Sequence, residues 1–207
     1  MDPVPGAPPV LPGTLGLQLS ALDVRERAAL DAIARPADRL RYAVAHLWLR
    51  ELLGRRLGLP PERVVFRTEP GPRGAAGRPE VVDPAVPTHF SVSYADRLAL
   101  VAVAPVPVGA DVEALPSPAA AVTLSRALHA EERAETVTSD RPDRSFARIW
   151  TRKEAYLKGL GTGLRRSLRA DYLGVRALAP PPAGWRVVDR AVDDRHHAAV
   201  AVAGDPA

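Results

Sequence analysis

The chain has 207 residues, contains no cysteine and carries a formal charge of +4 at pH 7. These values exclude disulfides and thiolate metal sites, and they favour an anionic partner such as a phosphate, a nucleic acid or an acidic protein. No apolar run is long enough for a membrane span, and residues 1–13 lack the basic and apolar regions of a signal peptide. We therefore expect a cytoplasmic protein without a membrane partner.

Local patterns divide the chain into helices followed by strands, twice over. The first set comprises a flexible lead-in at 1–13, a helix over 20–34 with Ser20 as N-cap, a helix over 37–57 ended by Gly58, a short strand over 64–66, a Gly/Pro/Arg loop over 69–80, and strands over 89–93 and 98–104. The second set comprises a strand over 108–113, helical patterns over 119–128, 130–137 and 145–158, and strands over 172–177, 185–188 and 198–203.

The strand over 98–104 is almost wholly apolar, so we expect a central strand buried on both faces. It is similar in composition to the strand over 198–203, which suggests an α+β protein built as a pseudo-repeat. The two halves would be residues 14–106 and 107–207, with a junction near Pro105 and Pro107.

The stretch 150–164 is the most informative, because its helical spacing places Trp150, Glu154 and Lys158 on one face. Lys153 and Lys158 are the only lysines in a chain that otherwise uses arginine. An ammonium group is a compact point charge that differs from a guanidinium at a phosphate site, so this pattern favours a functional site. The alternative is a surface Glu–Lys pair worth about 0.3–0.5 kcal/mol.

Two carboxylates, Asp111 and Glu113, lie two residues apart on the strand over 108–113 and should share one face, about 7 Å apart. Together with Glu154 they would form an all-oxygen ligand set of the kind that suits Mg²⁺. The alternative is a pair of solvated carboxylates at a strand end.

Weaker signals lie elsewhere. Arg78 and Pro79 belong to a Gly-Arg-Pro sequence that, taken alone, is an ordinary surface turn. Ser93 and Tyr94 lie at the end of a strand, where their hydroxyls could contact a phosphate. The alternative is that they are ordinary polar residues of a hairpin. Arg41 on the long helix is by default a surface charge. No histidines have metal-ligand spacing, and no nucleic-acid-binding motif is present, so nucleic acid is an improbable partner.

Taken together and in order, these motifs resemble the 4′-phosphopantetheinyl transferases of the larger, surfactin-synthetase-activating (Sfp) type. The residues that carry the resemblance are Asp38-Arg39-Leu40-Arg41, Gly77-Arg78-Pro79, Phe90-Ser-Val-Ser-Tyr94, Val108-Gly-Ala-Asp-Val-Glu113 and Trp150-Thr-Arg-Lys-Glu-Ala-Tyr-Leu-Lys158. The last two motifs are the specific ones, and the resemblance spans about residues 20–203.

The resemblance implies a pseudo-twofold monomer of two similar α+β halves, with coenzyme A in the cleft between them. It implies Mg²⁺-dependent transfer of the phosphopantetheine arm to a serine of an acidic acyl or peptidyl carrier protein, as in polyketide or nonribosomal peptide biosynthesis, with release of 3′,5′-ADP.

By matching position, the resemblance assigns metal binding to Asp111, Glu113 and Glu154, and catalysis to Glu154 and Lys158. It assigns coenzyme contacts to Arg41, Arg78, Pro79, Ser93, Tyr94, Asp111, Lys153 and Lys158. The role of Lys153 stays open between phosphate contact and carrier docking, Glu132 matches an acidic position of the family, and Trp150 is expected to be a packing anchor.

Two departures from the family pattern concern the coenzyme rather than the metal. Tyr94 stands where the family has a histidine that contacts the 3′-phosphate, and Glu26 and Ala29 stand where lysines are expected. An alternative function is therefore a catalytically weak homologue that binds a carrier protein or coenzyme A without turnover. A third, a basic nucleic-acid-binding module, has only the net charge in its favour.

Overall fold

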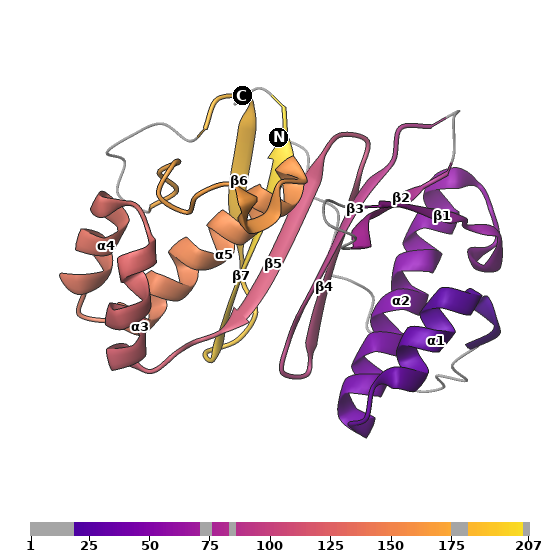
Figure 1. Ribbon diagram of the computed structural model, residues 1–207, viewed down its shortest axis with the longest axis horizontal. Helices are drawn as coiled ribbons and strands as arrows, with labels where there is room; N and C mark the ends of the chain where they lie inside the picture. Colours follow the sequence, from indigo (N-terminus) through magenta and orange to yellow (C-terminus); the bar gives the residue numbers. More distant parts are fainter. Residues whose placement is uncertain (1–18, 71–75, 83–85, 175–181, 205–207) are drawn as a thin grey trace.

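The computed structural model describes residues 19–70, 76–82, 86–174 and 182–204. Helices and antiparallel strands occur in separate blocks along this part of the chain, which confirms the α+β class (Figure 1). The expected lead-in at 1–13 lies outside the described residues. None of the helices described is long and apolar enough to cross a bilayer.

The elements follow one another in a simple order. They are η1 (Leu19–Ala21), α1 (Val24–Ala32), α2 (Pro36–Leu57), η2 (Pro61–Arg63), β1 (Phe66–Pro70), β2 (Ala76–Val81), β3 (His89–Ala95), β4 (Leu98–Ala104), β5 (Val108–Ala114), α3 (Pro118–Leu124), η4 (Ser125–Ala127), α4 (Ala130–Val137), α5 (Pro142–Leu160), η5 (Gly163–Arg165), β6 (Trp185–Arg190) and β7 (His196–Ala203), where η marks a 3₁₀ turn.

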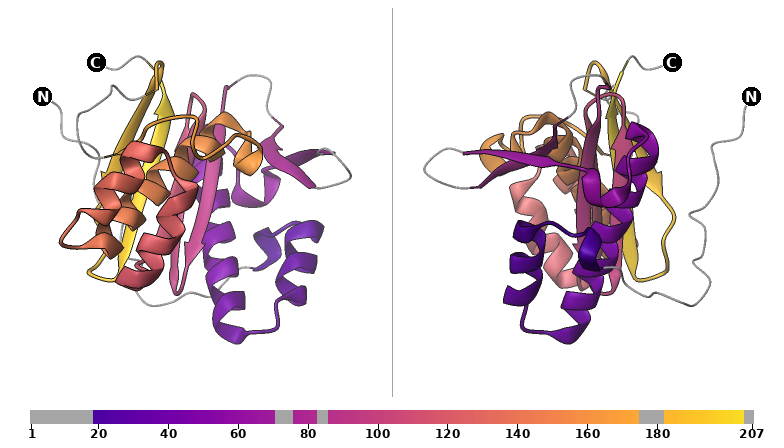
Figure 2. Two further views of the ribbon diagram at one scale, coloured as in Figure 1. Left: turned by 60° about the vertical axis from the view of Figure 1, so that its left-hand side comes forward. Right: turned by 90° about the vertical axis from the view of Figure 1, so that its right-hand side faces the viewer.

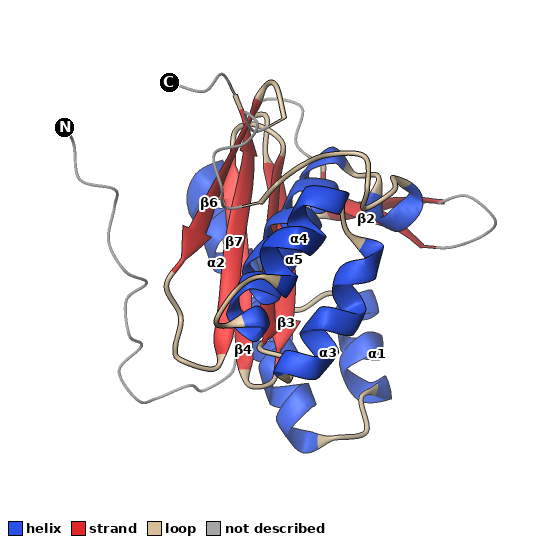
Figure 3. Ribbon diagram, turned by 90° about the vertical axis from the view of Figure 1, so that its left-hand side faces the viewer, coloured by secondary structure: helices blue, strands red, loops and turns tan. Residues whose placement is uncertain are grey.

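Two layers of helix enclose the strands. Helix α2 packs against β4 on one side of the molecule, and α5 packs against β5 and β7 on the other (Figure 1). Helices α3, α4 and α5 lie together on one side of the strands of the second half (Figure 3). The hairpin β1–β2 projects from the body of the protein (Figure 2).

The long helices end at glycines as the sequence predicts, whereas α5 begins three residues before the expected start at Ser145. Helix α2 has Pro36 in its first turn and Gly58 at its C-cap in the left-handed conformation, with φ of 68°. Helix α5 repeats this arrangement with Pro142 and with Gly161, whose φ is 71°. Proline lacks the N–H that a first turn leaves unpaired, and glycine adopts a positive φ without strain.

Helix α1 corrects the expected N-cap. Ser20 lies in the preceding 3₁₀ turn, and Asp23 caps the helix instead. The Asp23 carboxylate accepts hydrogen bonds from the backbone N–H groups of Arg25 and Glu26, and Glu26 accepts from the N–H of Asp23. This reciprocal capping box satisfies more of the unpaired donors than a serine three residues earlier would.

The strands bring three further corrections. The expected loop over 69–80 is instead a hairpin, in which Thr68 of β1 pairs with Pro79 of β2. Strand β4 is only partly buried along its length and, among the described strands, pairs with β3 alone, so it is not the expected central strand, whereas β5 is buried from Val108 to Val112. The part of the expected strand 172–177 that is described, up to Gly174, has no strand structure.

The part of the fold up to β4 and the part from β5 onward, called the first and second blocks below, meet along β3 and β5. Side chains hold these two strands together, and their contact is called the seam. The Ser91 hydroxyl accepts a hydrogen bond from the backbone N–H of Ala110 at 3.0 Å, and the Ser93 hydroxyl donates to Asp111 at 2.8 Å. These two serines point toward the second block from alternate positions of β3. The seam therefore brings polar atoms into the centre of the molecule, beside the face of β5 that α5 covers.

Helix α5 approaches β5 very closely, because two glycines face each other at the contact. A Cβ atom on Gly109 would overlap the backbone carbonyl of Ala155 and the backbone N–H of Gly159. A Cβ atom on Gly159 would lie 2.5 Å from the ring of Trp185. The absence of side chains at both positions fixes the distance between the helix and the strand, and so between the polar groups that they carry.

Candidate active site

A contact between α5 and the seam forms the centre of the candidate site. The Lys158 ammonium donates to Oδ1 of Asp111 at 2.6 Å and to the Ser93 hydroxyl at 2.9 Å. Ser93 donates to the same carboxylate oxygen of Asp111. Asp111 is 1% exposed, whereas the Lys158 side chain is 32% exposed. The structure thus brings together three residues that the resemblance assigned to one site. Asp111 lies at its buried end, and Lys158 extends from there toward solvent.

Burial raises the pKa values of all three predicted metal-binding carboxylates, and repulsion from Asp111 raises two of them further. For Asp111, burial raises the pKa more than the contacts with Lys158, Ser93 and the Val112 backbone lower it. For Glu113 and Glu154, burial is again the largest cause, and the negative charge of Asp111 is the next. Their charges therefore interact, as the spacing on β5 and α5 predicts.

Two oxygens at this site have no hydrogen-bond partner. Oδ2 of Asp111 and Oε1 of Glu154 are both buried and unpaired in the described structure. A buried carboxylate oxygen without a partner is costly, and a hard divalent cation that prefers oxygen ligands removes that cost. The donor set therefore fits Mg²⁺. The described carboxylates and histidines nevertheless contain no group of three that is already arranged around a metal position.

Trp150 has a second role besides packing. Its ring stacks on Phe146, with the centroids 5.7 Å apart, as expected of a packing anchor. Its side chain also makes a hydrogen bond with Glu113 that lowers the pKa of that carboxyl. The indole N–H is the only donor of a tryptophan side chain, so Trp150 orients one of the three carboxylates.

A second cluster lies on the other side of the seam, where α2 faces the end of β3. The guanidinium carbon of Arg41 lies 5.5 Å from the centroid of the Tyr94 ring, and Arg41 also pairs with Asp38 at 3.1 Å and donates to the backbone carbonyl of Asp96. The Tyr94 hydroxyl is buried without a partner, and burial together with nearby Tyr42 raises its pKa. Arg41 and Tyr94, both assigned to coenzyme binding, are therefore neighbours.

The Gly-Arg-Pro residues lie apart from both clusters. Arg78 and Pro79 belong to β2 of the projecting hairpin, and Pro79 is exposed. The side chain of Arg78 lies outside the described part of the structure. The hairpin position is compatible with proline because, among the described strands, β2 pairs with β1 alone, so the missing N–H interrupts no central ladder.

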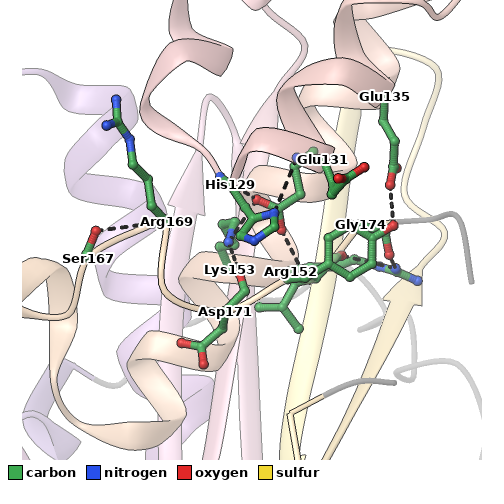
Figure 4. A network of polar contacts seen from close by, with 12 residues as sticks. His129, Glu131, Glu135, Arg152, Lys153, Ser167, Arg169, Asp171 and Gly174 are labelled. Atoms are coloured by element: carbon green, nitrogen blue, oxygen red, sulfur yellow. Dashed lines mark hydrogen bonds and ion pairs between the residues drawn. The ribbon is translucent and has the colours of Figure 1, made fainter. Parts of the chain in front are cut away.

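Lys153 lies on a different face of α5 from Lys158. Its side chain is 3% exposed and forms an ion pair with Glu132 at 2.9 Å, and its ammonium also donates to the backbone carbonyl of Asp171 (Figure 4). An ammonium group buried and bonded in this way is not available to a phosphate. The expected coenzyme contact of Lys153 is therefore replaced by a structural one.

Several residues that matter here escaped the sequence analysis. Ser91 joins the strands at the seam, and His196 bridges the two blocks: its Nε2 lies 3.0 Å from Asp96 and its Nδ1 lies 2.8 Å from Asp193. Asp96 has a φ of 47° in the turn between β3 and β4. Such contacts join residues up to a hundred positions apart, so no local pattern signals them.

Comparison with known proteins agrees with this geometry. The model of the 4′-phosphopantetheinyl transferase superfamily matches residues 107–196, which contain β5 and α5. The 4′-phosphopantetheinyl transferase HetI of Nostoc sp. is 30% identical over 201 residues, which cover 88% of this chain and 81% of HetI. The Synechocystis sp. protein slr0495 is 29% identical over 165 residues, or 77% of this chain. The 4′-phosphopantetheinyl transferase psf-1 of Bacillus pumilus is 28% identical over 146 residues, or 69% of this chain.

An α+β protein with a lysine–carboxylate site on a strand and a facing helix is thus also similar in sequence to known transferases. The chain belongs to the 4′-phosphopantetheinyl transferase superfamily. It spans 63% of the length of slr0495 and 59% of the length of psf-1.

Proposed function

We propose that this protein transfers the 4′-phosphopantetheine arm of coenzyme A to a serine of an apo acyl or peptidyl carrier protein, as an Sfp-type enzyme of the superfamily. The observation that carries the proposal is the contact of Lys158 with Asp111 and Ser93, next to two buried carboxylate oxygens that have no partner. A site of this kind concentrates cationic and metal-binding groups where a pyrophosphate needs them.

In the proposed reaction, the serine oxygen of the carrier forms a bond to the phosphorus that bears the pantetheine arm. The bond from that phosphorus to the bridging pyrophosphate oxygen breaks, and 3′,5′-ADP leaves with the electron pair. Glu154, directly or through a water, accepts the serine proton, an assignment supported by its raised pKa. Lys158, partly exposed, stabilises the charge that develops on the leaving pyrophosphate oxygen.

Asp111, Glu113 and Glu154 would hold Mg²⁺, with Trp150 orienting Glu113. When bound, the ion neutralises the pyrophosphate oxygens and polarises the phosphorus that is attacked. Arg41, Tyr94, Arg78 and Pro79 would contact the coenzyme from the first block. Ser93 would fix Lys158 and Asp111 relative to each other, since it bonds to both.

The architecture that we propose for this activity has two halves, residues 14–106 and 107–207, related by a pseudo-twofold axis and acting as a monomer in the cytoplasm. The junction near Pro105 and Pro107 falls between the end of β4 at Ala104 and the start of β5 at Val108. The carrier would be an acidic protein, in keeping with the charge of +4 on this chain.

The test is to incubate the protein with an apo carrier, coenzyme A and Mg²⁺, and to measure the mass of the carrier. A gain equal to one phosphopantetheine group is expected, and the gain should disappear with EDTA. No gain on any of a panel of fatty-acid, polyketide and peptide carriers contradicts the proposal.

One observation favours a second candidate, a homologue that binds without turnover. The Tyr94 hydroxyl is buried, so its only polar atom is poorly placed for a phosphate. Equilibrium binding of coenzyme A or of the carrier, combined with no mass gain, would identify this second function.

A further inference from the structure

The segment that follows α5 is fastened to the protein by buried charged groups. After η5 it runs without regular structure to Gly174 and folds back along α5 toward α4 (Figure 4). The buried pair of Lys153 and Glu132 holds it from beneath: Lys153 donates to the carbonyl of Asp171, and Glu132 accepts from the N–H of Leu173 at 2.6 Å. Glu132 is fully buried, with 0% exposure.

Further contacts fix the same segment at its end. The Tyr172 hydroxyl donates to Glu135 on α4, and Arg152 on α5 donates to the carbonyl of Gly174 at 2.8 Å. A Cβ atom on Gly174 would lie 2.4 Å from the Glu135 carboxylate, so the segment packs closely against that side chain. Burying charges costs free energy, and a loop that only connects two elements does not require such fastening.

The outer side of this segment carries positive charge. Arg165 donates to the carbonyls of Thr162 and Gly161, and Arg169 donates to the carbonyl of Arg126 at 2.8 Å. These three arginines are exposed, and no described carboxylate pairs with any of them. Arg166 differs, because Asp171 neutralises it through two hydrogen bonds of 2.5 and 2.8 Å.

Bonds to backbone carbonyls orient the guanidinium groups of Arg165 and Arg169 but leave their charge uncompensated. The arginines come from two elements, η4 and the segment after α5, that are joined by the bond from Arg169 to Arg126. Leu124, at the end of α3 and two residues before Arg126, is 49% exposed. An exposed apolar side chain beside charged groups favours a protein partner over a free phosphate, which makes no apolar contacts.

The segment also starts at the site. Gly161 follows three residues after Lys158, so Arg165 and Arg169 lie on the chain that leaves the Lys158 end of α5, and Arg126 on η4 lies beside them. We propose that Arg126, Arg165 and Arg169 form a docking surface for an acidic segment of the carrier protein, and that the pair of Lys153 and Glu132 positions this surface. The proposal rests on the proposed function, because it takes the carrier as the partner.

Docking is tested by binding alone, without turnover. The probe is an apo carrier whose acceptor serine is replaced by alanine, fluorescently labelled and titrated with the full-length protein at low salt. The double variant Arg165→Glu/Arg169→Glu should weaken carrier binding about ten-fold or more, because it places carboxylates against an acidic partner. Its affinity for coenzyme A, measured by calorimetry, should not change.

Two control variants accompany this measurement. Arg165→Lys/Arg169→Lys keeps the charge and should retain most of the carrier affinity. Arg186→Glu makes the same charge reversal at an exposed position of β6 and should bind the carrier like the unmodified protein. Raising the salt concentration should remove the difference between the unmodified protein and the double glutamate variant.

Three results overturn the proposal. An equal loss of coenzyme A affinity would mean that the arginines bind the coenzyme. Unchanged carrier binding would mean that these arginines are not a docking surface. A lack of binding to any carrier would mean that the partner is not a carrier protein. Transfer is scored separately by the mass of a serine-containing carrier. Binding without mass gain therefore contradicts the proposed enzyme but leaves the docking surface standing.

Discussion

The two lysines of α5, Lys153 and Lys158, differ in their burial and in the groups that pair with their charges. Lys158 lies on the face toward β5, partly exposed, beside carboxylate oxygens of which two have no partner. Lys153 lies toward α4, buried, with a fully buried carboxylate and a backbone carbonyl as its partners. Charge that serves the structure is matched by nearby groups, whereas charge at the candidate site is left partly unmatched. An unmatched buried oxygen costs stability, and a ligand that removes the cost is bound more tightly for it.

The strongest test of this comparison is to remove each side of the Lys158 contact. Asp111→Ala and Lys158→Ala should each reduce turnover about 10²–10³-fold, because each removes a charge that acts on the pyrophosphate. Initial rates of carrier modification measure the effect. Circular dichroism should show that both variants fold, and an unaltered rate in either would contradict the site assignment.

Substitution on the other face of α5, at Lys153, should reduce stability rather than turnover. Lys153→Met leaves Glu132 buried without its partner and should lower the free energy of unfolding by about 3–5 kcal/mol, measured by urea titration. The double variant Lys153→Met/Glu132→Gln should recover part of that loss, since no uncompensated charge remains. If Lys153→Met keeps full stability but loses coenzyme affinity, the contrast between the two lysines is wrong.

A smaller effect is expected at Tyr94. Replacing it by histidine should tighten coenzyme A several-fold more than 3′-dephospho-coenzyme A, because an imidazolium attracts the 3′-phosphate and a buried tyrosine hydroxyl does not. Calorimetry with the two ligands measures the difference. Equal changes for both would show that residue 94 does not contact that phosphate.

The smallest expected effect concerns the bridge at His196, which joins Asp96 in the first block to Asp193 in the second. The hydrogen bond that His196 donates to Asp193, and then the one that it donates to Asp96, raise the pKa of His196 above its usual 6.5. The protonated ring therefore stabilises the folded state fully below about pH 6.5, and this contribution is lost as the pH rises through the raised pKa.

His196→Gln should accordingly lower Tm by about 2 °C at pH 6 and by less at pH 9. Thermal unfolding at the two values measures the difference. The same loss at both would mean that the charge of His196 does not contribute.

How much of this was predictable depends on how local each signal is. The ends of α2 and α5 follow from Pro36, Pro142, Gly58 and Gly161, because caps depend on a few adjacent residues. The hairpin β1–β2 was missed because a glycine- and proline-rich stretch gives no alternating pattern, and cross-strand pairing forms it instead. The buried character of β5 rather than β4 depends on which helix covers which strand, and residue composition does not contain that information.

The candidate site divides in the same way. Spacing paired Asp111 with Glu113 and Glu154 with Lys158, and the family resemblance joined the two pairs in one site. The charges of these residues do affect one another in the structure. Five residues of helix separate the two lysines by about 140° around the axis, so they lie on different faces, although the resemblance assigned both to the coenzyme. Glu132 as the partner of Lys153, and Ser91 at the seam, required the tertiary structure.

The close approach of α5 and β5 also limits how this sequence can change. At Gly109 the obstacle to a side chain is backbone, so no second substitution elsewhere can make room for it. At Gly159 the obstacle is the ring of Trp185, which a smaller residue would remove. Position 109 therefore accepts glycine alone, whereas a side chain at position 159 requires a smaller residue at position 185. A library for directed evolution should hold the first constant and vary the other two jointly.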